Sequence, residues 1–150
     1  MRRIYYLNYG SNLGDREGNL WSADLRVSID IGLVVARSKV VESAPWGYDS
    51  DNPYLNMAVA VESFCEPLEV LDIIHEIERE LNGGRSHRDA DGNYLDRMID
   101  IDIMAIGSEV IDMPQLQVPH PRLMQRDFFR LPFAEIAPQW RHPVTGESLI

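Results

Sequence analysis

The chain has 150 residues, of which 45% are hydrophobic and 25% are charged. This composition excludes a disordered tail, a collagen and a coiled coil, and the length fits one domain over residues 1–150. The formal net charge of -10 gives a surface that repels polyanions, so we expect neither a nucleic acid nor a membrane as a partner.

The cysteine content and the N-terminus indicate a cytoplasmic protein. Cys65 is the only cysteine, so no disulfide forms within the chain, which favours a reducing compartment. The apolar stretch after Arg3 is interrupted at Asn8 and Ser11, which is too early for a signal peptide. No apolar run has the length needed to cross a bilayer.

The N-terminal half alternates between strand and helix signals. Residues 4–7 are rich in strand formers and are followed by a turn cluster at residues 10–15. Apolar residues then recur at helical spacing up to a glycine, which predicts a helix over residues 15–32. Residues 33–43 and 54–62 are predicted strands, and the segment between them, rich in Pro, Gly and Asp, is a predicted loop.

The C-terminal half continues the alternation. An early proline and an apolar stripe predict a helix over residues 67–83, and the polar residues 85–94 predict a loop. Because two glycines precede it and no apolar residue anchors it, we expect the segment 83–94 to close over bound substrates. Residues 98–106 are a predicted strand, residues 110–111 its return after a turn, and residues 123–131 a short helix. Strand, helix, strand, strand, helix, strand is the order of a ferredoxin-like α+β sandwich, an antiparallel sheet with helices packed on one face.

Two aspartates within residues 99–103 give the sharpest chemical signal. Side chains alternate along a strand, so the three isoleucines share one face and Asp100 and Asp102 share the other, with Cα atoms about 6.6 Å apart. Two carboxylates this close disfavour each other's charge unless a cation lies between them, and such pairs bind magnesium together with phosphate oxygens. The alternative is a solvated acidic face, but aspartate is depleted in strands, so we favour the metal site.

Arginine supplies almost all of the positive charge, because Lys39 is the only lysine among the 14 basic residues. This excludes the phosphate loop that ends in Gly-Lys-Ser/Thr and any lysine Schiff base outside position 39. Arginines suit bidentate phosphate contacts, with salt-bridged arginines as the alternative. Six of them lie close together in this acidic chain: Arg85, Arg88, Arg97, Arg122, Arg126 and Arg130.

Two weaker signals leave their alternatives open. The turn at residues 10–14 lies between a strand and a helix, where exposed amides bind phosphate, but a plain turn capped by Asp15 explains it equally well. Four aromatic residues in or beside predicted loops would stack on a flat heterocycle or fill the core: Trp46, Tyr54, Tyr94 and Phe128.

Four segments in a specific order and spacing give the chain a resemblance to the 6-hydroxymethyl-7,8-dihydropterin pyrophosphokinase family over essentially its whole length. The segments are residues 9–15, 53–56, 97–104 and 118–122. The resemblance implies a ferredoxin-like fold and the transfer of pyrophosphate from ATP to the pterin hydroxymethyl group, leaving AMP, in folate biosynthesis. The implied partners are therefore ATP and the pterin, and we expect a monomer.

The same resemblance implies roles for individual residues. Asp100 and Asp102 match the aspartates that hold two magnesium ions and, with Arg85 and Arg97, form the implied catalytic set. The matches to ATP-contacting positions are Glu78, Arg85, Arg88, Arg97, Ile103, His120 and Arg126. The matches to pterin-contacting positions are Ser43, Ala44, Pro45 and Trp46 in one loop, Tyr54 and Asn56 at the pterin edge, and Tyr94 and Phe128 on the two ring faces.

Two other classes of function remain open. A magnesium-dependent phosphotransferase or nuclease with another substrate would keep the aspartates but would not need Tyr54, Asn56 and a stacking pair. A non-catalytic or diverged ferredoxin-like module that binds a pterin or nucleotide would explain the fold. Such a module would leave the aspartate pair and the arginine cluster without a role.

Overall fold

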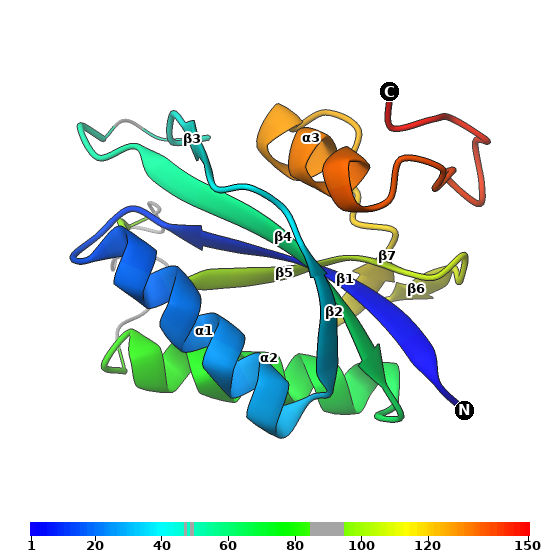
Figure 1. The fold of residues 1–150 in the computed structure, drawn as a ribbon, viewed down its shortest axis with the longest axis horizontal. Coiled ribbons are helices and arrows are strands. Elements are labelled where there is room, and N and C mark those ends of the chain that lie inside the picture. Colours follow the sequence, from blue (N-terminus) through cyan, green and yellow to red (C-terminus); the bar gives the residue numbers. More distant parts are fainter. Residues whose placement is uncertain (47, 49, 85–94) are drawn as a thin grey trace.

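The computed structural model describes every residue except 47, 49 and 85–94, so the predicted loop over residues 85–94 lies outside the described residues. One antiparallel sheet forms the centre of the fold, with the strand order β2-β4-β1-β5 and a further strand, β3, paired to β4 (Figure 1). The strands are β1 (Arg3–Ser11), β2 (Leu33–Arg37), β3 (Val41–Ser43), β4 (Tyr54–Ser63) and β5 (Asp100–Ile106). This order confirms the ferredoxin-like fold.

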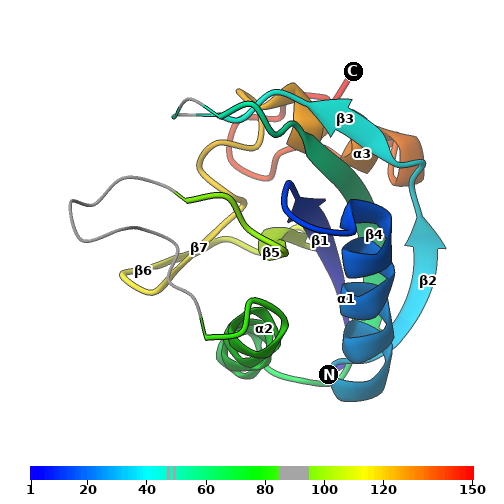
Figure 2. The same cartoon turned by 90° about the vertical axis from the view of Figure 1, so that its left-hand side faces the viewer.

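Helices cover both faces of this sheet. α1 (Arg16–Asp30) and α2 (Pro67–Leu81) lie on one face, and α3 (Asp127–Ile136) lies on the other (Figures 1 and 2). The expectation of helices on one face alone was therefore wrong. A small hairpin of β6 (Ile111–Met113) and β7 (Leu116–Val118) follows β5. No helix in the described part of the chain is long and apolar enough to cross a membrane.

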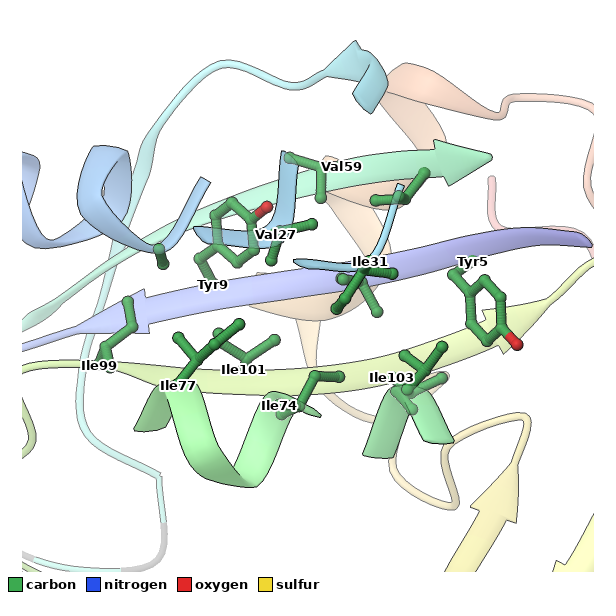
Figure 3. Close-up of a cluster of buried hydrophobic side chains, with 14 of the residues drawn as sticks. Tyr5, Tyr9, Val27, Ile31, Val59, Ile74, Ile77, Ile99, Ile101 and Ile103 are labelled. Atoms are coloured by element: carbon green, nitrogen blue, oxygen red, sulfur yellow. The ribbon is translucent and has the colours of Figure 1, made fainter. Parts of the chain in front are cut away.

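The main core lies between the sheet and the helix pair α1–α2. Alternate residues of β1, β4 and β5 point into it, and α1 and α2 contribute the stripes that the helical periodicity predicted (Figure 3). Ile99, Ile101 and Ile103 are all among its buried side chains, as the alternation of β5 predicted. A smaller core lies on the face of α3 and contains Ala58, Met104, Leu123, Phe129, Phe133 and Leu149.

Two predicted elements, the second strand and the third helix, differ clearly from the structure. The predicted strand over residues 33–43 is divided into β2 and β3, because residues 38–40 lie opposite only two residues of β4. Ser38 stabilises this bulge, since its N–H donates to the Ala58 carbonyl at 2.8 Å and its hydroxyl accepts from the Ala58 N–H at 2.9 Å. The third helix starts at Asp127 rather than residue 123, and it continues through Pro132, where the sequence predicted an end.

Side chains of α2 and of its C-terminal cap cover the start of the free edge of β5. A Glu78 carboxylate oxygen accepts a hydrogen bond from the N–H of Ile101 at 2.9 Å. The Asn82 side chain accepts from the N–H of Met98 at 2.9 Å and donates to the carbonyl of Ile99 at 2.9 Å. These bonds fix the strand that carries the two aspartates, because they satisfy backbone groups that have no neighbouring strand.

Candidate active site

The face of the sheet opposite the main core forms the floor of a cavity of about 370 Å³. The strand register places its side chains in two rows across β4, β1 and β5. The rows are Asn56, Gly10 and Asp100, and next to them Ala58, Asn8 and Asp102. A Cβ atom on Gly10 would lie 3.4 Å from Oδ1 of Asn56, so the glycine keeps the middle of the floor open.

The walls of this cavity come from segments far apart in the sequence. The connection between β3 and β4, the segment before β5, and the start of α3 all contribute side chains. The residues named from the sequence that the structure brings together here are Ala44, Trp46, Tyr54, Asn56, Glu78, Arg97, Asp100, Asp102, His120, Arg126 and Phe128.

Other residues named from the sequence lie elsewhere. Ser43 stands behind Asn56 and accepts a hydrogen bond from its Nδ2 atom at 2.8 Å, and Pro45 does not line the cavity. Ile103 is buried on the opposite face of β5, where it lines a second cavity and not the first. Arg85, Arg88 and Tyr94 lie outside the described residues, as do residues 85–94 of the predicted closing loop.

Four lining residues escaped the sequence analysis: Asn8, Tyr48, Leu95 and Phe129; a fifth, Gly10, was named there only as part of the predicted turn. Asn8 and Gly10 carried a usable signal, because they alternate with buried apolar residues in β1 and so share one face of the sheet. Tyr48 and Leu95 lie in irregular segments, where no periodicity indicates which way a side chain points.

Three carboxyl groups crowd at the boundary of the cavity. Burial and the charge of Asp100 raise the pKa of Asp102 to about 7, and burial raises the pKa of Glu78 to about 8. Burial also raises the pKa of Asp100, although a guanidinium nitrogen of the buried Arg97 lies 3.0 Å from its carboxylate. The site therefore favours a proton or a cation between these carboxylates.

His120 faces this group of carboxyls as a neutral side chain. Burial and the charges of Arg126 and Arg122 lower its pKa to about 4. Its Nδ1 atom accepts a hydrogen bond from the N–H of Arg122 at 3.0 Å. The remaining proton is therefore on Nε2, which lies 3.9 Å from the Asp102 carboxylate.

The donor set suits magnesium bound together with a polyphosphate. The side chains of Asp100 and Asp102 are 26% and 38% exposed, so both carboxylates reach the cavity. The described residues contain no group of three His, Cys, Asp or Glu side chains placed to hold a metal. Magnesium retains several waters and is commonly bound by one or two carboxylates plus substrate phosphates, which two aspartates satisfy.

A second cavity of about 340 Å³ adjoins the first and shares three of its residues, Glu78, Asp102 and His120. It lies between α2, β5 and the β6–β7 hairpin. Its other lining residues are apolar or carry amide and imidazole groups: Leu71, His75, Ile101, Ile103, Pro114, Gln115, Leu116, Gln117 and Pro121. The carboxyl group of Asp102 thus lies at the junction of two cavities.

Comparison with known proteins identifies the family. The family model for 7,8-dihydro-6-hydroxymethylpterin-pyrophosphokinase matches residues 6–138. A 2-amino-4-hydroxy-6-hydroxymethyldihydropteridine pyrophosphokinase of Porphyromonas gingivalis is 43% identical over 141 residues, which are 93% of this chain and 94% of that protein. The enzyme of the same name from Bacillus subtilis is 37% identical over 147 residues, which are 97% of this chain and 85% of that protein.

Among solved structures, the wild-type HPPK-DHPS of Plasmodium falciparum with pteroate superimposes with a TM-score of 0.76. The match covers 99% of this chain but only 41% of that chain, and the sequence identity is 17%, so this likeness shows the fold alone. The family model and the two bacterial relatives cover most of the chain. The chain therefore belongs to the 7,8-dihydro-6-hydroxymethylpterin-pyrophosphokinase family.

Proposed function

We propose that the chain transfers the pyrophosphoryl group of ATP to the hydroxymethyl group of 6-hydroxymethyl-7,8-dihydropterin, with AMP as the second product, in folate biosynthesis. Membership of the family supports this reaction. The observation that carries it to particular residues is the pair of adjoining cavities that meet at Asp102, Glu78 and His120. Two substrates bound side by side would meet at the carboxylate pair.

The first cavity is the proposed pterin site. Asn56 donates through Nδ2 to Ser43, which leaves its carbonyl oxygen to accept hydrogen bonds from the amino and ring N–H groups of a pterin. That oxygen lies beside the open space above Gly10. Tyr54 and Phe128 offer ring surfaces for stacking. Tyr94, which lies outside the described residues, is kept in this site by resemblance.

The second cavity is the proposed nucleotide site. Ile103 and Leu116 give it an apolar lining suited to the faces of an adenine ring, and Gln115 and Gln117 add amide groups for its polar edge. Arg97 and Arg126 line the neighbouring first cavity, where they would contact the phosphates. Arg85 and Arg88 lie outside the described residues and stay in the proposal by resemblance.

The reaction needs positioning and charge neutralisation rather than a covalent intermediate. The pterin hydroxymethyl oxygen forms a bond to the β-phosphorus of ATP and loses its proton to solvent. The bond from that phosphorus to the oxygen that bridges to the α-phosphorus breaks, and this oxygen leaves with AMP. Asp100 and Asp102 would hold magnesium, which when bound neutralises and polarises the polyphosphate. Arg97 keeps the Asp100 carboxylate oriented through its contact at 3.0 Å.

The metal content, oligomeric state and compartment of the enzyme can be proposed on the same basis. We propose two magnesium ions, because a triphosphate and two carboxylates together offer enough oxygens for two octahedral ions that also retain water. We propose a monomer with one domain over residues 1–150, because residues of a single chain line both cavities. Free Cys65 suits the reducing cytoplasm.

Identification of the nucleotide product tests the proposed function. The protein is incubated with ATP, magnesium and hydroxymethyldihydropterin, and the nucleotides are separated and quantified. We expect AMP to accumulate in step with pterin consumption, and no AMP when the pterin is omitted. ADP instead of AMP would indicate an ordinary kinase, and an absence of turnover with retained ligand binding would indicate a binding module.

A further inference from the structure

A polar network that is only partly buried lies beside the first cavity, apart from the groups assigned to the reaction. We name it the Asp96 network; it consists of Asp96, Asn12, Tyr48 and Asn52. One carboxylate oxygen of Asp96 accepts hydrogen bonds from Asn12 Nδ2 at 2.8 Å and from the Tyr48 hydroxyl at 3.0 Å, and the other accepts from Asn52 Nδ2 at 2.7 Å. The network thus joins the end of β1, the β3–β4 connection and the segment before β5.

Asn12 makes the network part of the framework around β5. Its side chain is buried, and the side-chain Oδ1 atom accepts a hydrogen bond from the backbone N–H of Arg97 at 2.8 Å. The backbone N–H of Asn12 donates to the backbone carbonyl of Arg97 at 3.0 Å. Arg97 in turn contacts the Asp100 carboxylate at 3.0 Å. Asp96 therefore links the mostly irregular β3–β4 connection to the segment before β5, and the sheet fixes the position of that segment.

Tyr48 links the network to the cavity, which it lines. Its hydroxyl oxygen lies 3.2 Å from that of Tyr54, and the Tyr54 hydroxyl lies 3.4 Å from the carboxylate of Asp100. The single hydroxyl proton of Tyr48 is donated to the Asp96 carboxylate, because a charged acceptor is the stronger one. The single Tyr54 hydroxyl proton then has two alternative acceptors, the Tyr48 oxygen and the Asp100 carboxylate. The position in which Asp96 holds Tyr48 therefore affects how the Tyr54 hydroxyl is oriented.

Asp96 is suited to this task because it stays charged. Burial raises its pKa, but hydrogen bonds from Ser50, Asn52, Asn12 and Tyr48 outweigh burial, and the net pKa is lowered. At neutral pH the carboxylate therefore accepts from all of its partners at once.

We propose that Asp96, acting through Tyr48, is a positioning residue for the pterin: it fixes the described part of the β3–β4 connection before substrate arrives and orients Tyr54 beside Asp100. This inference rests on the proposed function, since it takes the first cavity as the pterin site. A wall that is already ordered binds its ligand more tightly, because the ordering cost is met during folding and not during binding.

The test compares the KM for the pterin with the KM for ATP. Tyr48→Phe and Asp96→Ala should each raise the pterin KM by about tenfold, the effect of losing a hydrogen bond to a charged group, and should leave the ATP KM within about twofold. Asp96→Asn, which retains one carbonyl oxygen, should fall between Asp96→Ala and the wild type. Asp51→Asn is the matched control, because it removes an exposed carboxylate from the same connection, and it should change neither constant.

A double variant separates positioning from general destabilisation. Tyr48→Phe and Asp96→Ala share one hydrogen bond, so their combination should raise the pterin KM little beyond the larger single effect. Parallel increases in both KM values, multiplicative effects in the double variant, or a pterin KM like that of Asp51→Asn would each overturn the proposal. Tyr48→Phe is the mild change that keeps the test decisive if Asp96→Ala folds poorly. Wild-type protein that forms no AMP would refute the proposed function itself, whereas active wild type with indifferent variants would refute only the positioning role.

Discussion

The guanidinium carbon of Arg126 lies 4.2 Å from the centre of the Trp46 ring. Arg122 lies 5.4 Å from the same ring, so two cations of the segment before α3 stack on one residue of the β3–β4 connection. Cation–π contacts of this kind hold the two walls of the first cavity together. They also make Trp46 a reporter, because whatever enters the cavity changes the surroundings of its ring.

The first prediction follows from that contact. Titration of hydroxymethyldihydropterin into the protein with magnesium and a non-hydrolysable ATP analogue should quench tryptophan emission, because dihydropterins absorb where tryptophan emits. Trp46→Phe should remove the largest share of the quenching, because its ring is nearest to the first cavity, and Trp21→Phe, at an exposed position on α1, should keep most of it. Equal quenching in the Trp46→Phe variant would place the bound pterin elsewhere.

The second prediction concerns the carboxylate pair. Asp102→Asn should lower AMP formation by at least about a hundredfold, because a metal ligand contributes several kcal/mol to stabilisation of the transition state. Circular dichroism should be unchanged, since the side chain faces the cavity and not the core. Asp112→Asn, an exposed acid on β6, is the control and should keep full activity. Near-normal turnover of Asp102→Asn at saturating magnesium would mean that the pair is only an acidic surface.

The third prediction concerns the pH dependence of stability without metal. The folded-state pKa values of Asp102, about 7, and Glu78, about 8, lie above the values of about 4 in an unfolded chain, so the folded state binds more protons. Stability must therefore fall as pH rises through these values. His120, whose folded-state pKa is lowered to about 4, acts in the opposite sense only below its unfolded pKa of about 6.5.

Differential scanning calorimetry in EDTA between pH 6.5 and 8 separates the contribution of the carboxyl groups to stability from that of His120. The melting temperature should decrease as pH rises over this range, and Glu78→Gln should make the slope shallower. Magnesium with an ATP analogue should raise the melting temperature more at pH 8 than at pH 6.5, because deprotonated carboxylates bind the cation. A melting temperature that is constant or that increases with pH would contradict the raised pKa values.

The fourth prediction compares two buried asparagines near the same end of β1. Among the described residues, the side-chain oxygen of Asn8 has no hydrogen-bond partner, whereas the side chain of Asn12 bonds to Arg97 and Asp96. Asn8→Ala should stabilise the protein by about 1 kcal/mol, or roughly 2–4 °C, because it removes an unsatisfied buried group. Asn12→Ala should destabilise it by more than about 2 kcal/mol. Thermal melts of both variants check the pair, and a loss of stability in Asn8→Ala would show that its oxygen is satisfied in the folded protein.

The sequence was most informative where a periodic pattern met a buried face. The alternation of residues 99–103 predicted that isoleucines would pack in the core and that Asp100 and Asp102 would share the other face, and the structure confirms this arrangement. The apolar stripes of α1 and α2 were predicted for the same reason. In these elements one local period decides which side chains are buried.

Features that depend on distant partners could not be predicted in this way. The neighbourhood of Asn56, Gly10 and Asp100 follows from the register of three strands, which no single segment encodes. The bonds from Asp96 to Tyr48 and Asn52 join irregular segments more than 40 residues apart. The continuation of α3 through Pro132 depends on burial of Pro132 and Phe133 against the sheet, which outweighs the backbone preference of proline.

The closed edge of β5 has a consequence for how separate copies of the chain behave. An open strand edge is a template on which another molecule can add a strand, and this is a common route to aggregation. Glu78 occupies the N–H of Ile101, and Asn82 occupies backbone groups of Met98 and Ile99 just before β5, so a visiting strand finds fewer free groups there. At the opposite end of the sheet the bulged pairing of β2 makes a poor template. The side chains that hold the carboxylate-bearing strand in place thus also protect the sheet from edge-to-edge association. A substitution at Asn82 should therefore increase aggregation in solution before it lowers the secondary-structure content.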